Sequence, residues 1–216
     1  MSYNVFIVNP TIMDNWYAEW FTHDIVTDIE FSDVVLFPDG DQLSPFLYKD
    51  IRKPHSIINP TKDLSDIKWF KKAVKKEIPI IGIGRGAELI CVMNGGKVIQ
   101  DHPFGDTVQI VENYDGTKNL AECYNSMTQF PFNIKKENYF ILSWRKPLKY
   151  HYNGKGKEMN PEVLPDIVYY PKTKSLAIES YPQSLSKTST SLKWLNQHLD
   201  YLISNTLWQK LKKYQH

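Results

Sequence analysis

A predicted strand and a predicted helix meet within the stretch Ile80-Ile81-Gly82-Ile83-Gly84-Arg85-Gly86-Ala87-Glu88-Leu89-Ile90. Residues 78–83 form a nearly continuous apolar run with the length of a buried strand. Residues 85–94 then carry apolar side chains at helical spacing, and Gly95-Gly96 follows as a helix stop. The sequence therefore predicts a strand, a sharp turn at Gly84 and a helix.

The rest of the chain extends this pattern in both directions. Before the stretch we expect strands at residues 4–8 and 33–37 and a helix at residues 66–76. After it we expect shorter, antiparallel strands and a final helix, at residues 108–111, 139–143, 167–170, 176–178 and 189–213. This order indicates an α/β fold with a mostly parallel central sheet covered on both faces by helices. Ligands of such sheets bind at the carboxyl ends of the strands.

Length and composition fit one globular domain spanning residues 1–216, because a single core serves domains of up to roughly 250 residues. The formal net charge of +2 gives no reason to expect nucleic acid or a membrane as a partner, and no apolar run is long enough for a membrane helix. We expect a cytoplasmic protein that uses no cofactor and no metal. Cys91 and Cys123 are too few for a disulfide framework or a cysteine-based zinc site.

Two stretches in the first half resemble class I glutamine amidotransferases, and especially their relatives that hydrolyse γ-glutamyl amides. The first is Phe37-Pro38-Asp39-Gly40-Asp41-Gln42-Leu43-Ser44-Pro45-Phe46-Leu47-Tyr48, which is similar to the family's F-T-G-G-x-D-V-S-P-x-L-Y. The second is the stretch 80–90 with the downstream Asn94-Gly95-Gly96-Lys97-Val98-Ile99-Gln100-Asp101. It resembles the family's nucleophile elbow, G-I-C-R-G-x-Q, and its later G-G-x-x-x-Q-D.

Two further stretches follow in the family's order. Asn125-Ser126-Met127-Thr128-Gln129 resembles its N-S-x-H-x-Q loop, and Ala177-Ile178-Glu179-Ser180-Tyr181-Pro182-Gln183 resembles the strand that ends in Q-G-H-P-E. The resemblance covers most of the chain and implies a flavodoxin-like three-layer sandwich of the class I glutamine amidotransferase type. The chain also resembles amidotransferase-like proteins of large tailed phages.

The resemblance implies a cysteine, a histidine and a carboxylate at three positions, and this chain lacks all three. Such amide hydrolysis uses a thiolate at the elbow, a histidine that moves the proton and a carboxylate that orients the histidine. Gly84 stands at the nucleophile position, Tyr181 at the histidine position and Gln183 at the carboxylate position. Glycine offers no nucleophile, and a phenol with a pKa of about 10 is a poor base at neutral pH. We therefore expect no intact catalytic residue.

The positions around the implied pocket are altered as well. The family has Gly-Gly in its oxyanion loop, whereas this chain has Asp39-Gly40, and a carboxylate there opposes a developing negative charge. Glu88 replaces the glutamine of the elbow helix, and Glu179 replaces the glutamine two residues before the histidine. The expected pocket residues are Asp39, Gly40, Arg85, Gly86, Glu88, Ser126 and Glu179.

The sequence leaves the use of several of these residues open. Four acidic side chains either form a site for a cation or an amine, or are solvated residues at a pocket rim: Asp39, Asp41, Glu88 and Glu179. Four aromatic side chains either pack on the sheet or form an exposed interface: Trp16, Tyr17, Trp20 and Phe21. Cys91 lies two helical turns beyond Gly84 and is expected to be a small core residue and not a relocated nucleophile.

The function expected from these positions is that of a pseudoenzyme. It would bind an unknown small molecule in the former glutamine pocket, or a protein partner. One alternative is a glutamine amidotransferase or γ-glutamyl amide hydrolase with substituted catalytic residues, drawn from Tyr181, Glu88, Asp39 and Ser126. A second alternative is an inactive glutaminase-like subunit of a synthetase.

Overall fold

A computed structural model describes residues 3–10, 24–52, 57–100, 107–123, 127–146, 163–186 and 188–214. Its main sheet contains β1 (Asn4–Ile7), β2 (Asp24–Ile25), β3 (Val34–Phe37), β4 (Ile80–Ile83), β6 (Thr107–Asn113), β7 (Lys118–Cys123), β9 (Phe140–Arg145), β10 (Leu164–Tyr170) and β11 (Ser175–Ile178). The strands lie in the order β2-β1-β3-β4-β11-β10-β9-β6-β7. The first five of this order are parallel, and each pair from β11 onward is antiparallel. A second, two-stranded sheet pairs β5 (Lys97–Ile99) with β8 (Thr128–Phe130).

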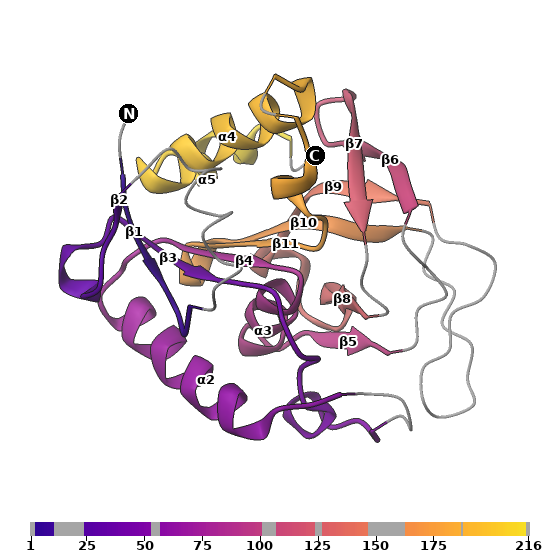
Figure 1. Cartoon of the computed structure of the whole chain (residues 1–216). Helices are drawn as coiled ribbons and strands as arrows, with labels where there is room; N and C mark the ends of the chain where they lie inside the picture. Colours follow the sequence, from indigo (N-terminus) through magenta and orange to yellow (C-terminus); the bar gives the residue numbers. More distant parts are fainter. Residues whose placement is uncertain are drawn as a thin grey trace.

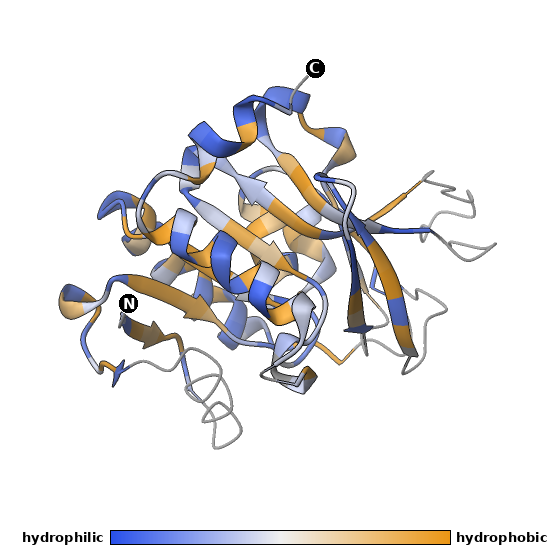
Figure 2. Ribbon diagram, turned by 90° about the horizontal axis from the view of Figure 1, so that it is seen from above, coloured by the Kyte–Doolittle hydropathy of each residue, from blue (hydrophilic) through white to orange (hydrophobic). Residues whose placement is uncertain are grey.

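Helices cover both faces of the main sheet (Figure 1). One face carries α2 (Pro60–Lys75) and α3 (Arg85–Met93), and the other carries α4 (Thr190–Ile203) and α5 (Leu207–Lys212). Successive strand residues point to opposite faces, so Val34 and Leu36 of β3 join the core with α4 while Val35 and Phe37 join the core with α2 and α3. In Figure 2 the central strands are largely apolar whereas the helices show both colours. The three-layer α/β architecture expected from the sequence is confirmed.

Two helices differ from the sequence expectation. The first, α2, begins at Pro60 and not at residue 66, because Asn59 accepts the Lys62 N–H at 3.1 Å and Pro60 occupies the first helical position. The expected helix at 189–213 is two helices, separated at Asn205. Asn205 has a φ of 57°, and the Thr206 N–H bonds to the Tyr201 carbonyl at 2.8 Å, which ends α4 in a Schellman turn.

Four strands were not expected from the sequence: the short strands β2, β5 and β8, and the six-residue strand β7. They have little alternation of their own, and neighbouring strands supply the hydrogen bonds that hold them. The aromatic group at residues 16–21 lies outside the described residues. None of the described helices has the length and apolar character needed to cross a membrane.

Two glycines let the elbow helix approach the sheet closely. A Cβ added at Gly82 of β4 would lie 2.3 Å from the Gly86 carbonyl oxygen, and one added at Gly86 would lie 2.1 Å from the Phe37 carbonyl oxygen. Both obstacles are backbone atoms, which cannot swing aside as a side chain can. The start of α3 is therefore fixed against β3 and β4 by the absence of two side chains.

Replacing Gly86 with alanine should reduce the free energy of unfolding by about 3 kcal/mol or more, because the added methyl group overlaps the backbone of β3. Urea denaturation monitored by tryptophan fluorescence would measure the loss. Gly116→Ala is the matched control, since nothing lies within 4 Å of a Cβ there and only its φ of 81° opposes the change. Equal losses in the two variants would contradict the close-packing explanation.

Candidate functional site

The turn between β4 and α3 places Gly84 at the carboxyl edge of the parallel strands. Gly84 has a φ of 53° and a ψ of −114°, and its N–H donates to the Ile178 carbonyl of β11 at 2.8 Å. Glycine adopts such a positive φ at the least cost, whereas a residue with a side chain is strained there. The chain thus keeps the backbone of a nucleophile elbow at a residue that has no nucleophile.

Asp39, in the loop after β3, accepts hydrogen bonds from two residues at this elbow. Its Oδ1 accepts the backbone N–H of Arg85 at 2.8 Å, and its Oδ2 accepts a hydrogen bond from the phenol of Tyr181. In enzymes with such an elbow, the N–H of the residue after the nucleophile stabilises the oxyanion of the transition state. Arg85 is that residue in this chain. A carboxylate of the protein itself therefore occupies the N–H that a reacting oxyanion would need.

The Arg85 side chain is 1% exposed and does not take part in these contacts with Asp39. Its guanidinium binds two carboxylates of α2: Nη2 lies 2.5 Å from Oδ1 of Asp63, and Nη1 contacts Oδ2 of Asp66. Both aspartates are as buried as the arginine. Arg85 was expected in the pocket, and the structure places its charged group in a buried network that joins α2 to α3.

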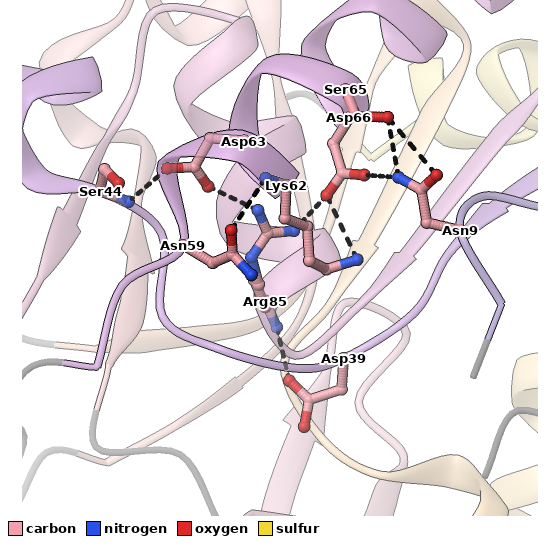
Figure 3. A network of polar contacts seen from close by, with 9 residues as sticks. All are labelled: Asn9, Asp39, Ser44, Asn59, Lys62, Asp63, Ser65, Asp66 and Arg85. Atoms are coloured by element: carbon pink, nitrogen blue, oxygen red, sulfur yellow. Dashed lines mark hydrogen bonds and ion pairs between the residues drawn. The ribbon is translucent and has the colours of Figure 1, made fainter. Parts of the chain in front are cut away.

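This network continues to the ends of two strands (Figure 3). Asn9, which follows β1, donates to Oδ1 of Asp66 at 2.8 Å. The backbone N–H of Ser44, in the loop after β3, donates to Oδ2 of Asp63 at 3.2 Å, and Nζ of Lys62 lies 3.5 Å from Oδ2 of Asp66. The loops that surround the elbow are therefore held by one set of polar contacts.

Two buried glutamates lie behind the elbow. Glu88 and Glu179 are each 2% exposed, and in each the Oε2 atom has no hydrogen-bond partner among the described residues. Burial raises the pKa of Glu88 to about 8, with a further contribution from the charge of Asp39 against the opposing effect of Arg85. Burial, then the charge of Glu88, raises the pKa of Glu179 well above its ordinary value, although its Oε1 accepts the Gln129 N–H at 2.6 Å. Both side chains favour the protonated form.

The other expected site residues have different positions. Gly40 is exposed in the loop after β3, and Gly86 packs against β3. Ser126 lies outside the described residues, and so does the side chain of Gln183, whose backbone is in the 3-10 helix Pro182–Ser184. Cys91 is a buried free thiol whose pKa is raised to about 12 chiefly by burial, as a core residue would be.

The four acidic residues do not form one cation site. Asp39 bonds to Arg85 and Tyr181, Asp41 is exposed, and the two glutamates are enclosed in the interior. Within the described ranges, no three histidine, cysteine or acidic side chains are placed to hold a metal ion. The interpretation in which these four carboxylates together bind a cation is therefore not supported.

Asp63 and Asp66 support the site but were absent from the sequence-based prediction. The helix expected from the sequence begins at residue 66 and leaves Asp63 outside it. That expectation therefore does not place the two carboxylates on one helical face. The available signal was Asn59-Pro60, a typical helix start, which would have included Asp63 in the helix.

The Peptidase C26 family model matches residues 20–140 of this chain. Among curated proteins, the chain is 36% identical over 77 residues to the glutamine amidotransferase-like protein RP404 of Rickettsia prowazekii (strain Madrid E), covering 35% of this chain and 27% of that protein. It is 30% identical over 83 residues to the YvdE homolog of Lactococcus lactis subsp. cremoris, also a glutamine amidotransferase-like protein, covering 37% of this chain and 43% of that one. The chain thus spans less than half the length of either relative.

Solved structures share the fold over nearly the whole chain. A protein from Thermoplasma acidophilum that is described as part of a GMP synthase superposes with a TM-score of 0.62 at 11% identity, covering 97% of both chains. A glutamine amidotransferase from Thermotoga maritima gives a TM-score of 0.53 at 11% identity, covering 98% of this chain and 90% of that one. At this level of identity the likeness establishes the α/β fold of class I glutamine amidotransferases.

Arg85→Met should lower the free energy of unfolding by about 3–5 kcal/mol, because it leaves Asp63 buried without a counter-charge and Asp66 with only the more distant ammonium of Lys62. Urea denaturation at neutral pH measures this. Lys72→Met serves as the control: Lys72 is 41% exposed and pairs with Glu30 at 3.7 Å, so its loss should be below about 1 kcal/mol. A similar, small loss in both variants would mean that the buried network does not hold α2 to α3.

Stability should fall as the pH rises through the titration of Glu88. Its folded pKa of about 8 is above the ordinary value of 4.5, so the folded state binds this proton more tightly than the unfolded state. The resulting stabilisation is complete below pH 4.5 and is lost as the pH rises through about 8. Each unit of pKa difference corresponds to about 1.4 kcal/mol.

Glu88→Gln should flatten this decline, as seen in urea midpoints measured across that pH range. Glu137→Gln, the same change at an exposed position, should leave the decline as it is in the unmodified protein. The assignment fails if the pH profile of Glu88→Gln matches that of the unmodified protein.

Proposed function

The chain belongs to the Peptidase C26 family, and from that premise we propose that it is a catalytically inactive member that binds a ligand or partner. Its relatives are glutamine amidotransferase-like proteins, and its fold is that of class I glutamine amidotransferases. A cytoplasmic location is part of the proposal.

The hydrogen bonds of Asp39 carry the proposal. Acyl transfer at an elbow needs a nucleophile, a base and free N–H donors for the oxyanion. Here Gly84 supplies no nucleophile, and the phenol of Tyr181 donates a hydrogen bond to Asp39 where a base would have to accept a proton. The Arg85 N–H is bonded to the same carboxylate. The chain thus has no nucleophile at Gly84, and hydrogen bonds to Asp39 occupy both the phenol at the base position and the N–H at the oxyanion position.

The same contacts count against a hydrolase with substituted catalytic residues. Of the candidates for that alternative, Tyr181 and Asp39 are bonded to each other, and Glu88 is enclosed behind the elbow. A buried carboxyl whose pKa is raised can act as an acid or base only where a substrate reaches it. The position of Glu88 at 2% exposure gives a substrate no such contact in this structure.

A second candidate function, that of an inactive subunit in a synthetase-like complex, is favoured by an apolar stripe on the β6–β7 hairpin. Val108, Ile110 and Leu120 are 61%, 64% and 52% exposed, and Ile110 pairs directly with Leu120 across the two strands. Exposed neighbouring apolar side chains are typical of protein interfaces. Ile110→Lys should disrupt a complex recovered from the native host if this stripe binds the partner.

Glutamate release from glutamine and from a panel of γ-glutamyl amides tests the main proposal. The unmodified chain should release no more glutamate than a buffer blank. The variant Gly84→Cys, Tyr181→His, Gln183→Glu restores the three catalytic residue types but leaves Asp39 on the Arg85 N–H. Adding Asp39→Gly should raise any turnover of this variant by about 10²-fold, the usual effect of one oxyanion donor.

Robust turnover by the unmodified chain would refute the proposal. Turnover in the triple variant that is unchanged by Asp39→Gly would refute the role given to Asp39 while leaving the loss of the catalytic residues as the explanation. Circular dichroism of every variant guards against a loss of folding, which matters because Gly84→Cys introduces a side chain at a positive φ.

A further inference from the structure

A pocket of about 550 Å³ lies at the carboxyl ends of β1 and β3, beside the first turns of α2. Its lining includes Asp39, Gly40 and Asp41 of the loop after β3 and Thr61, Lys62 and Ser65 of α2. In the sheet, β2 lies on one side of β1 and β3 lies on the other. The order of the strands along the chain therefore reverses between β1 and β3, at the pocket. In α/β proteins ligands bind in the crevice at such a reversal.

This pocket borders the elbow and shares Asp39 and Gly40 with it. Gly84, Glu88, Glu179 and Tyr181 are absent from its described lining, and of the residues around the elbow that the structure describes only Asp39 and Gly40 belong to it. Its volume is within the range of roughly 300–1,000 Å³ that is usual for small-molecule sites and is too large for a single ion.

The lining has an acidic wall and a basic wall. The loop after β3 contributes the carboxylates of Asp39 and Asp41, and α2 contributes the ammonium of Lys62 with the hydroxyls of Thr61 and Ser65. The two walls meet at Gly40, where an added Cβ would lie 3.6 Å from Cε of Lys62. Among the residues that the structure describes, no apolar side chain lines the pocket. The pocket therefore presents charged groups of both signs, although the stems of these side chains make most of its exposed surface apolar, and it suits a small organic ligand that carries both charges.

Lys62 keeps the capacity to bind such a ligand. Its side chain is 17% exposed, and its ammonium lies 3.5 Å from Oδ2 of Asp66. An ammonium group carries three N–H donors, so Lys62 can bind a carboxylate of a ligand while it stays paired with Asp66. Asp41 is exposed at the opposite wall and can accept hydrogen bonds from an ammonium group.

We propose that this pocket binds a small zwitterionic amino compound, with its ammonium group toward Asp41 and Asp39 and its carboxylate toward Lys62 and Thr61. A simple anion is disfavoured by the two carboxylates, and a simple amine is disfavoured by the Lys62 ammonium. The inference rests on the proposed binding function and gives it a site and a class of ligand.

Isothermal titration calorimetry with linear ω-amino acids, from β-alanine to 6-aminohexanoate, tests the proposal. Each probe is compared with the amine and the carboxylate of the same chain length, which carry only one of the two charges. At least one ω-amino acid should bind at least about tenfold more tightly than both of its single-charge analogues. Equal affinity of an amine or a carboxylate, or no binding by any ω-amino acid, would overturn the proposal.

Two variants locate the binding site. Thr61→Trp should abolish binding by filling the pocket, and Asp41→Asn should weaken it by about tenfold through loss of one charged contact. Both positions are exposed, so the fold should tolerate the changes. Glu137→Gln, an exposed change elsewhere, should leave affinity unaltered. Full binding in Thr61→Trp would place the ligand outside this pocket and refute the assignment.

The outcome is independent of the turnover assay. Absence of both binding and turnover would remove the pocket's ligand class and leave the catalytic inactivity standing. Turnover combined with pocket binding would refute the catalytic inactivity and leave the pocket's ligand class standing.

Discussion

The buried ion pairs of Arg85 with Asp63 and Asp66 are the constraint on which the site depends. An arginine removed from water is tolerated only where its charge is matched. The two aspartates of α2 supply that match at Nη1 and Nη2, while Nε has no hydrogen-bond partner among the described residues. Because the side chain is fixed in this way, the backbone of Arg85 is fixed too, and with it the N–H that meets Asp39. The position of α2 and the chemistry at the elbow are consequently linked through one residue.

This link explains how the elbow can keep its shape without a thiol or an imidazole. The contacts that hold the elbow are the ion pairs of Arg85, the glycine packing at positions 82 and 86, and the Gly84 N–H bond to β11. None of them uses a thiol or an imidazole. A catalytic side chain is therefore not needed to hold this scaffold, whereas Arg85 and Gly86 are.

Much of the fold could be predicted from the sequence because its central strands are continuous apolar runs and its elbow has a distinctive order of glycines. The sequence also identified Asp39, Gly84 and Tyr181 as altered positions. It could not show that Asp39 and Tyr181, 142 residues apart, are hydrogen-bonded, because such a contact depends on which strand ends meet at one edge of the sheet. The sequence also could not predict that Arg85 is buried, because a charged residue in a family motif is equally consistent with a pocket and with an internal ion pair. The break at Asn205 was missed because the apolar stripe continues across it, and the turn that interrupts the helix is a backbone feature.

Asp39 also competes with free anions for the Arg85 N–H, because it is part of the same chain and already bonded there. A carboxylate attached to the chain beside the Arg85 N–H has an effective local concentration on the order of millimolar or higher, since even a short flexible linker gives millimolar values and this loop is held by other contacts. A free carboxylate at ordinary metabolite levels would have to displace it and would gain no new donor by doing so. A small anion in solution would therefore meet an Arg85 N–H that is already bonded, whereas the next acidic residue of the same loop, Asp41, stays exposed at the neighbouring pocket.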